Sequence, residues 1–366
     1  MKAIAIVPGT TEVDLVDMEE PHITQPDEVK IKMEAVGICG TDREEVSGGR
    51  ADAPKGKKRL VIGHEMFGKV VETGADVHSV KPGDYGVFMV RRGCGQCNAC
   101  LNERSDMCYT GRYTERGIKG ADGYQAEYVV DKEIYLVPVP AHMRDIGVLT
   151  EPMSVAAKAI DEALLIQDAR LKDFVKDKNW LKGKRTLVAG IGPIGLMAAF
   201  ALRLRGADVT GLDIVEEGSR RPAILKGIGG KYIDGRKVKV LDLDDSTGEY
   251  DFIFEATGIA QIQMALIDAL ATNGVYVVTG IPSEKRTPDI PAGSLLQQLV
   301  LKNQVIVGSV NAGIAHYKMA VDYLEKSLKK WPELIRSVIT NRIPYKEYDR
   351  ALHEHDENEI KVVVEW

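Results

Sequence analysis

The sequence predicts an α/β protein of two domains, one a barrel-like antiparallel domain and the other a doubly wound parallel sheet with helices. Its length of 366 residues suits two domains of ordinary size better than one. Short β-like runs alternate with glycine, proline and aspartate turns as far as about Tyr135, which is typical of an antiparallel barrel. From Arg185 onward, apolar strands alternate with helical segments, and that order indicates a parallel sheet.

The first domain is expected to contain several short strands. They read KAIAIV, EVKIKMEAV, MFGKVVETG, DYGVFMV and AEYVVD in chain order. Residues 146–171 then predict a helix, because apolar residues recur there at helical spacing, at Val155, Ala159, Ala163 and Ile166. The chain therefore changes from short strands to a long helix at this point.

A repeating order of strand and helix makes up the second domain. RTLVAG, PIGLMAAFALRLRG and DVTGLDI read as strand, helix and strand, and YDFIFEAT and GVYVVTGI continue the sheet. Beyond Ala312 a helix, HYKMAVDYLEKSLKK, leads to a final strand, IKVVVEW. We expect this strand to rejoin the first domain, because the parallel sheet looks complete by Val310. The expected domains are therefore residues 1–153 with 312–366, and residues 154–311.

Composition and charge exclude several classes of protein. The chain is 44% hydrophobic and 28% charged, as soluble globular proteins are. A net charge of -6 gives no general attraction to nucleic acid, and no apolar run reaches the roughly 18 residues that a membrane crossing needs. No apolar signal segment is found at the N-terminus. We therefore expect a cytoplasmic protein without nucleic-acid or membrane partners.

Four of the five cysteines form the pattern C-x2-C-x2-C-x7-C within RRGCGQCNACLNERSDMC, and they are Cys94, Cys97, Cys100 and Cys108. Four thiolates this close favour one tetrahedral Zn2+ whose closed coordination is structural rather than catalytic. An iron–sulfur cluster is a weaker alternative, because the bacterial pattern places its fourth cysteine after three residues and follows it with proline. Disulfides are another alternative, which the odd cysteine count and the large chain disfavour.

A glycine-rich turn stands at the end of the strand RTLVAG and opens a helix. Its pattern, G-x-G-x-x-G, lets a pyrophosphate rest on the helix N-terminus, and its residues are Gly190, Ile191, Gly192, Pro193, Ile194 and Gly195. Asp213 ends the second strand, where a carboxylate accepts hydrogen bonds from ribose hydroxyls and repels a 2'-phosphate. NAD is therefore favoured over NADP, although Arg220 and Arg221 add positive charge nearby. The alternative is a glycine turn in a domain that binds something else.

A second group of metal-ligand types lies apart from the cysteine cluster, with Cys39 in GICGTDRE and His64 and Glu65 in VIGHE. Singly, each has an ordinary structural explanation, such as a buried thiol or a satisfied histidine. Together with a nicotinamide domain they predict a catalytic Zn2+ with an open position, a Lewis acid that eases loss of hydride from an alcohol. Thr41 is expected to bond the substrate oxygen and pass its proton outward, unless its hydroxyl only caps the turn.

Over its whole length the chain resembles the zinc-dependent medium-chain alcohol dehydrogenases. GICGTD, GHE, the four-cysteine lobe, TEP and GIGPIG occur in the order of that family. CGTDRE, RRGCG, ERGI, GSVNA and EIKVVVEW are similar in particular to the archaeal-type glucose dehydrogenase branch, which oxidises aldoses at C1. The resemblance implies a GroES-like barrel as the catalytic domain and a Rossmann domain for the cofactor, with the active site in the cleft between them.

The resemblance also implies a set of ligands for the catalytic zinc. Cys39 and His64 match zinc ligands of the family, and Glu65 matches a glutamate that ligates in some states. Glu151, in the TEP motif, matches a fourth acidic ligand. The chain has Glu44 where the polyol branch usually carries histidine, which disfavours a histidine proton relay.

Sugar and cofactor contacts are implied in the same way. Glu115, Glu151 and Asn311 would contact sugar hydroxyls beside Thr41. The residues implied along the cofactor are Gly280, Ile281, Val310, Asn311 and Lys361. Taken alone, Glu115 and Lys361 would be interpreted as solvated surface charges.

The sequence therefore predicts an NAD-preferring dehydrogenase that oxidises an aldose, glucose or a close relative, at C1 to the lactone, with NADP as a possible cofactor. One zinc would be catalytic and another structural, and the protein would act in carbohydrate metabolism as a homodimer or homotetramer. A polyol or secondary-alcohol dehydrogenase is the rival of the same class. A non-catalytic NAD-binding zinc protein is the rival of another class, because fold alone does not secure activity.

Overall fold

The computed structural model describes residues 1–172, 179–282 and 288–366. They form two compact units, of which the first contains Met1–Ser154, Asn311–Leu328 and Ile335–Trp366, and the second Val155–Val310 and Lys329–Leu334. None of the helices in the described ranges combines the length and the apolar character that a membrane crossing requires.

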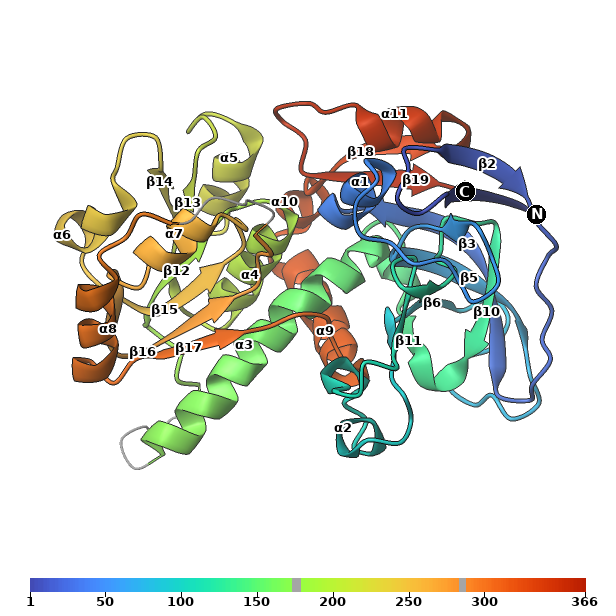
Figure 1. The fold of residues 1–366 in the computed structure, drawn as a ribbon, viewed down its shortest axis with the longest axis horizontal. Helices are drawn as coiled ribbons and strands as arrows, with labels where there is room; N and C mark the ends of the chain where they lie inside the picture. The colour runs from blue at the N-terminus through green and yellow to red at the C-terminus, as the bar shows by residue number, and fades with distance from the viewer. Residues whose placement is uncertain (173–178, 283–287) are drawn as a thin grey trace. The chain divides into compact units, whose positions relative to one another are not determined.

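The first unit is built around a seven-stranded, mostly antiparallel sheet (Figure 1). Its order is β11-β6-β5-β3-β19-β18, and β10 also pairs with β3. The strands are β3 (Glu28–Ile38), β5 (Glu65–Thr73), β6 (Tyr85–Phe88), β10 (Tyr128–Lys132), β11 (Leu136–Val139), β18 (Ile339–Pro344) and β19 (Lys361–Glu365). The C-terminal strand β19 pairs with β3, so the prediction that it rejoins the first domain is confirmed. β18 and β19 are parallel, because α11 (Tyr348–His353) supplies a crossover between them.

Two three-stranded sheets and short helices complete the first unit. One sheet contains β1 (Lys2–Ile6), β2 (Val13–Asp17) and β4 (Leu60–Val61), and the other β7 (Arg91–Arg92), β8 (Thr114–Arg116) and β9 (Gly120–Ala121). The helices that begin in this unit are α1 (Gly40–Val46), α2 (Asn98–Leu101), α3 (Thr150–Leu171), α9 (Ile314–Lys330) and α11. Alternate residues of β19, Val362 and Val364, pack with Ile4, Ile6 and Ile38 in one apolar core, as the period of a strand requires.

The second unit is a six-stranded parallel sheet with the order β14-β13-β12-β15-β16-β17 (Figure 1). Its strands are β12 (Arg185–Ala189), β13 (Asp208–Asp213), β14 (Lys231–Asp234), β15 (Tyr250–Glu255), β16 (Leu270–Val278) and β17 (Val305–Gly308). The order reverses between β12 and β15, which is the doubly wound arrangement that the sequence predicted.

Helices cover both faces of this sheet, which is why its strands are apolar on both sides. Leu187 and Ala189 share one core cluster with Leu243 and Leu295, whereas Val188 lies on the face where α4 packs, since it is close to the Cβ position of Gly195. The helices are α4 (Pro193–Leu204), α5 (Arg220–Gly227), α6 (Leu243–Thr247), α7 (Ala260–Ala265), α8 (Ala292–Leu301) and α10 (Pro332–Arg336).

One predicted boundary was wrong. The helix expected over residues 146–171 begins at Thr150, because Gly147–Leu149 form a 3-10 turn before it. The Thr150 hydroxyl donates to Gly147 O at 2.7 Å and closes that turn. The remaining predicted strands and helices lie within a few residues of their expected positions.

Candidate active site

One buried carboxylate, that of Asp42, positions both Cys39 and His64. Cys39 precedes α1, and its backbone N–H donates to Asp42 Oδ2 at 2.7 Å, which fixes the turn into the helix. His64 Nδ1 lies 3.5 Å from Asp42 Oδ1, longer than a normal hydrogen bond. Because Nδ1 faces Asp42, the other ring nitrogen is left for a metal ion.

The protonation of this group depends on its burial and its charges. Burial alone would raise the pKa of Asp42, but His64 and the Cys39 N–H hold it below its ordinary value. Burial alone would lower the pKa of His64, but Asp42 raises it well above its ordinary value. Burial, together with the charge of Glu65, raises the pKa of Glu151 to about 7. Several acidic groups therefore share a small buried space, which favours a bound cation.

Glu65 occupies space that a glycine on the neighbouring strand leaves open. Glu65 lies in β5 directly opposite Gly37 of β3. A Cβ at Gly37 would lie 2.2 Å from Glu65 Oε2. Both carboxylate oxygens of Glu65 accept from Lys361 Nζ, at 2.7 and 2.6 Å, and the same ammonium donates to Ile38 O at 3.0 Å. Lys361 is 2% exposed, so it is not a solvated surface charge. Its implied contact with a cofactor stays a prediction.

Cys39, His64 and Glu65 offer one sulfur, one nitrogen and one oxygen atom within 4.8 Å of one another. This donor set fits Zn2+, and three protein ligands leave one of four positions open, as in catalytic sites. Glu151 is near enough for Glu65 to shift its pKa, but it is not one of the three residues that meet within this distance. Thr41 follows Cys39 in α1, is half-buried, and its hydroxyl makes no hydrogen bond to another described residue.

The four cysteines of the lobe also converge. Cys97 Sγ lies 3.5 Å from Cys100 Sγ and 3.9 Å from Cys108 Sγ, and Cys94 Sγ lies 4.0 Å from Cys100 Sγ. Sulfur atoms around one tetrahedral zinc would be about 3.8 Å apart. All four thiols are free of disulfides, and the Thr110 hydroxyl is the main cause that lowers the pKa of Cys94 to about 5. The lobe therefore fits a zinc ion with four thiolate ligands.

In the second unit, the glycine-rich turn links β12 to α4. Gly190 has a φ of +81°, and a Cβ there would lie 2.9 Å from Ala256 O. A Cβ at Gly195 would lie 1.8 Å from Gly190 O, so only glycine lets α4 approach the turn. At Gly192, by contrast, a Cβ would meet open space, so the backbone there is accessible to a ligand. This arrangement fits a pyrophosphate at the N-terminus of α4.

Asp213 faces this turn from the end of β13. Its Oδ2 accepts from the Ile191 N–H at 2.8 Å, and Arg221 Nη1 lies 3.9 Å from the same oxygen. Pro193 and Ile194 are the first residues of α4. The structure therefore brings the carboxylate predicted to bind ribose together with the turn predicted to bind phosphate.

The other residues implied along the cofactor fall in both units. Gly280 and Ile281 follow β16, and Val310 follows β17, all in the second unit. Ile281 is 60% exposed and Val310 is 50% exposed. Exposed apolar side chains of this kind are found at ligand-binding surfaces. Asn311 and Lys361 belong to the first unit.

Glu115, predicted to contact the sugar, is fixed on one side only. Arg91 donates to Glu115 Oε1 through Nε at 3.1 Å and Nη2 at 2.9 Å, and Asn311 Nδ2 donates to the same oxygen at 2.5 Å. Arg91 is itself held by the carbonyl of Asp106, at 2.7 Å. Glu115 Oε2 accepts no hydrogen bond from the described residues. A buried carboxylate with one oxygen fixed and one available is suited to bind a hydroxyl.

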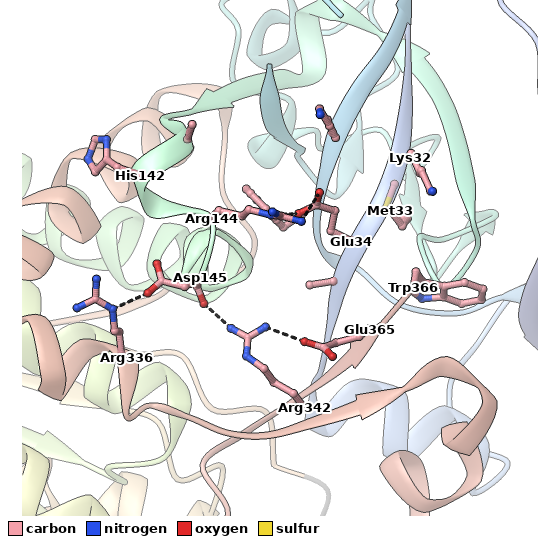
Figure 2. Close-up of a pocket in the computed structure, with 14 residues that line it drawn as sticks. Lys32, Met33, Glu34, His142, Arg144, Asp145, Arg336, Arg342, Glu365 and Trp366 are labelled. Carbon is pink, nitrogen blue, oxygen red and sulfur yellow. Dashed lines mark hydrogen bonds and ion pairs between the residues drawn. The ribbon is translucent and has the colours of Figure 1, made fainter. Parts of the chain in front are cut away.

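A separate hollow of the first unit is lined by charged residues that pair with one another (Figure 2). Arg336 donates to the Asp145 carboxylate, and Arg342 bridges the Asp145 carbonyl and the Glu365 carboxylate. None of the residues that we assign to metal, sugar or cofactor lines this hollow. Because Arg144, Arg336, Arg342, Glu34, Asp145 and Glu365 already form ion pairs, we assign no chemistry to the hollow.

Comparison with known proteins shows the family to which the chain belongs. Residues 144–366 match the family model described as glucose dehydrogenase C-terminus, and residues 25–141 match the alcohol dehydrogenase GroES-like domain. The glucose 1-dehydrogenase of Methanocella arvoryzae is 35% identical, over 100% of this chain and 99% of that protein. Glucose 1-dehydrogenase 2 of Vulcanisaeta moutnovskia is 37% identical with the same coverage. The chain belongs to the glucose 1-dehydrogenase branch of the zinc-dependent medium-chain alcohol dehydrogenases.

A solved structure of this family has the same fold. It is Haloferax mediterranei glucose dehydrogenase in complex with NADP, Zn and gluconolactone. The TM-score is 0.89 and the identity 32%, over 100% of this chain and 99% of that one. The predicted family and the predicted pairing of a GroES-like domain with a Rossmann-like parallel sheet are therefore confirmed.

Two residues of the site were missed in the sequence. Asp42 stands three residues after Cys39, the spacing of a capping box, so that signal was present. Arg91 and Glu115 are 24 residues apart, and no local pattern indicates that the two side chains meet. Asp42 holds the turn at Cys39 and faces His64, and Arg91 fixes one oxygen of Glu115.

Proposed function

We propose that this chain oxidises an aldose, glucose or a close relative, at C1 to the lactone, and that zinc at Cys39, His64 and Glu65 serves the reaction. The observation that carries the proposal is that one ligand atom from each of these three side chains lies within 4.8 Å of the others, with His64 and Glu65 buried and Cys39 half-buried. Three protein ligands would leave one position of a tetrahedral zinc open. A purely structural protein has no need of an open metal position. The non-catalytic alternative is therefore disfavoured.

The residues of the chain supply positioning and proton transfer. Cys39, His64 and Glu65 would hold the zinc ion, which would lower the pKa of the sugar's C1 hydroxyl. Thr41 accepts that proton through its hydroxyl and releases its own outward. A nicotinamide cofactor held at the glycine-rich turn would accept the C1 hydrogen as hydride, so that the sugar would lose one proton and one hydride and become a lactone. Glu115 and Asn311 hold the remaining sugar hydroxyls, and Glu151 adds a further acceptor.

We propose NAD as the preferred cofactor. Asp213 already accepts an N–H from the glycine-rich turn, and its charge repels a 2'-phosphate. Arg221, at 3.9 Å, weakens that repulsion, so NADP would be used less well rather than refused. Gly190, Gly192 and Gly195 would hold the pyrophosphate, and the solved relative from Haloferax contains NADP.

The domain roles follow from the same assignments. Residues 1–153 and 312–366 would form the catalytic domain, with one catalytic zinc and one structural zinc, and residues 154–311 the cofactor domain. Cys94, Cys97, Cys100 and Cys108 would hold the structural zinc. A cytoplasmic location stays a prediction.

We propose a homo-oligomer that uses the β17 edge of the parallel sheet. β17 ends the strand order, so one of its edges has no partner strand in the described part of the chain. Leu296, Val300 and Leu301 just before β17 are 61%, 73% and 72% exposed, and Ile306 within it is 40% exposed. A second copy would cover these apolar side chains. Ile306→Lys should then yield monomers in light scattering, unlike Leu165→Lys in α3, and a monomeric unmodified protein would contradict the proposal.

A substrate panel tests the function. Initial rates would be measured for glucose, galactose, xylose, sorbitol, butanediol and ethanol with NAD and with NADP. A site built to bind several hydroxyls leaves polar groups unpaired with a plain alcohol, which can cost on the order of 10^4-fold in specificity. We expect at least one aldose to exceed every alcohol. If sorbitol or butanediol is turned over more efficiently than every aldose, the protein is a polyol or secondary-alcohol dehydrogenase and the proposed function is wrong.

A further inference from the structure

Glu255 is a buried carboxylate at the carboxyl end of β15, where neither metal nor sugar chemistry explains it. Its exposed fraction is 0%. Oε1 accepts from the Thr257 N–H and hydroxyl, each at 2.6 Å, and from the Gly258 N–H at 3.0 Å. Oε2 accepts from Gln263 Nε2 at 2.8 Å and from the Gly280 N–H at 3.3 Å. One carboxylate therefore binds the loops that follow β15 and β16.

All five of these donors are neutral. In the described residues, no lysine, arginine or histidine forms an ion pair with Glu255. In the described part of the chain, the groups that hold this carboxylate therefore leave its charge uncompensated. In a low-dielectric interior such a charge acts over a longer range than it would in water.

Glu255 lies at the point where a dinucleotide would bind. The strand order reverses between β12 and β15, and ligands of such sheets bind outside the carboxyl ends of the strands at that point. The loop after Glu255 touches the glycine-rich turn, since a Cβ at Gly190 would lie 2.9 Å from Ala256 O and 3.1 Å from Thr257 Cγ2.

The position of Glu255 in the strand order indicates which half of the cofactor would lie near it. Asp213, at the end of β13, is the residue expected to bind the adenosine ribose. The nicotinamide half therefore extends in the opposite direction along the strand order, over β15 and β16. Oxidised nicotinamide carries a positive charge, whereas the reduced ring is neutral.

We propose that Glu255 is a specificity-determining residue that favours the oxidised over the reduced nicotinamide cofactor by its fixed negative charge. This inference rests on the proposed use of a nicotinamide cofactor. It assigns the residue a role in cofactor exchange, because tighter binding of the oxidised cofactor lowers its KM and weaker binding of the reduced product speeds its release, while the overall equilibrium of the reaction is unchanged.

Equilibrium binding to the zinc-loaded, full-length protein tests the proposal. Dissociation constants for NAD+, NADH and ADP-ribose would be measured without sugar, by calorimetry and by NADH fluorescence. In Glu255→Gln, we expect the affinity for NAD+ relative to NADH to fall about three- to tenfold, with ADP-ribose following NADH. Thr257→Val is the matched control, because it removes one donor to the same carboxylate and leaves the charge, so all three affinities should change together.

Three other outcomes would overturn the proposal or the proposed function. If Glu255→Gln weakens NAD+ and NADH equally, the residue only supports the loops, and the proposal is overturned. If Glu255→Gln does not fold, Glu255→Asp decides, since a retained charge should keep the relative affinity of the unmodified protein. A changed ratio in Glu255→Asp would then overturn the proposal. An unmodified protein that binds no nicotinamide cofactor would instead refute the proposed function itself.

Discussion

Both carboxylate oxygens of Glu65 accept hydrogen bonds from the buried ammonium of Lys361. The two residues are 296 positions apart in the chain. The C-terminal strand β19 therefore supplies a contact to a proposed metal ligand. Lys361 therefore competes with a metal ion for the Glu65 carboxylate. Glu65 can serve as a third ligand only when it shares its charge with Lys361 or leaves it.

Replacement of Lys361 by methionine should destabilise the metal-free protein. It leaves the Glu65 carboxylate buried without a cation, and breaking such a pair costs about 3–5 kcal/mol. Urea unfolding of EDTA-treated protein would measure the loss. Adding Glu65→Gln to Lys361→Met should restore part of it, because the uncompensated charge is then removed. Equal stability of Lys361→Met and the unmodified protein would contradict the importance of this pair.

Metal content should separate the two proposed zinc sites. Cys39→Ser should lose one zinc and the activity but keep its melting temperature, because the open site serves chemistry. Cys100→Ser should lose the other zinc and melt at a lower temperature, because the lobe has four ligands and little apolar core of its own. Elemental analysis and differential scanning fluorimetry would measure both. Full activity in Cys39→Ser, or a single zinc in the unmodified protein, would refute the assignment.

Asp213→Asn should reduce the difference in kcat/KM between NAD and NADP. Removing the charge that repels the 2'-phosphate should raise kcat/KM with NADP about tenfold, equivalent to ~1.4 kcal/mol, chiefly through KM. Adding Arg221→Ala should reverse the gain, because Arg221 is then no longer available to the phosphate. Comparable efficiencies with both cofactors in the unmodified protein would count against the argument.

Asp131 should make the first unit sensitive to acid. Burial alone would raise the pKa of Asp131, but Arg116 and Arg92 hold it below its ordinary value of 3.8. Because the folded pKa is the lower one, the stabilisation is complete above about pH 5 and is lost as the pH falls through the folded pKa. Asp131→Asn should therefore lower the free energy of unfolding by about 3 kcal/mol at pH 7 and by less at pH 3. A difference that does not depend on pH would contradict this account.

Much of the fold could be predicted because its signals are local. The strand that ends before Gly190 is an apolar run of the right length, and the turn between this strand and the next helix has a fixed pattern. The start of α3 at Thr150 could not be predicted as well, because a 3-10 turn and an α-helix have similar sequences.

Contacts distant in the chain were not predictable from pattern alone. Lys361 and Glu115 were interpreted from family resemblance, yet nothing local indicates that Lys361 meets Glu65 or that Arg91 meets Glu115. Glu255 ends an apolar strand and has no motif that indicates a function. Such buried charges become visible only when the strands that supply their partners are placed side by side.

The hydrogen bonds of Glu115 lead to a prediction for sugar binding. Oε1 is occupied by Arg91 and Asn311, and Oε2 is available to a sugar hydroxyl. Glu115→Gln should therefore raise KM for the aldose, because a neutral amide makes a weaker hydrogen bond and disturbs the contact with Arg91. We expect kcat/KM for the aldose to fall about tenfold to a hundredfold, in line with the loss of a charge-assisted hydrogen bond worth roughly 1.5–3 kcal/mol.

Arg91→Lys separates positioning from direct contact. Lysine keeps the charge but cannot supply the forked donors that bind Glu115 and the Asp106 carbonyl together. If Arg91 acts by orienting Glu115, Arg91→Lys should reduce kcat/KM for the aldose and leave residual oxidation of a short alcohol nearly unchanged. Steady-state rates with both substrates, at saturating cofactor, would measure the two effects. Equal losses for aldose and alcohol would show that Arg91 supports the fold of the lobe rather than the sugar site, because a short alcohol has no second hydroxyl for Glu115 to bind.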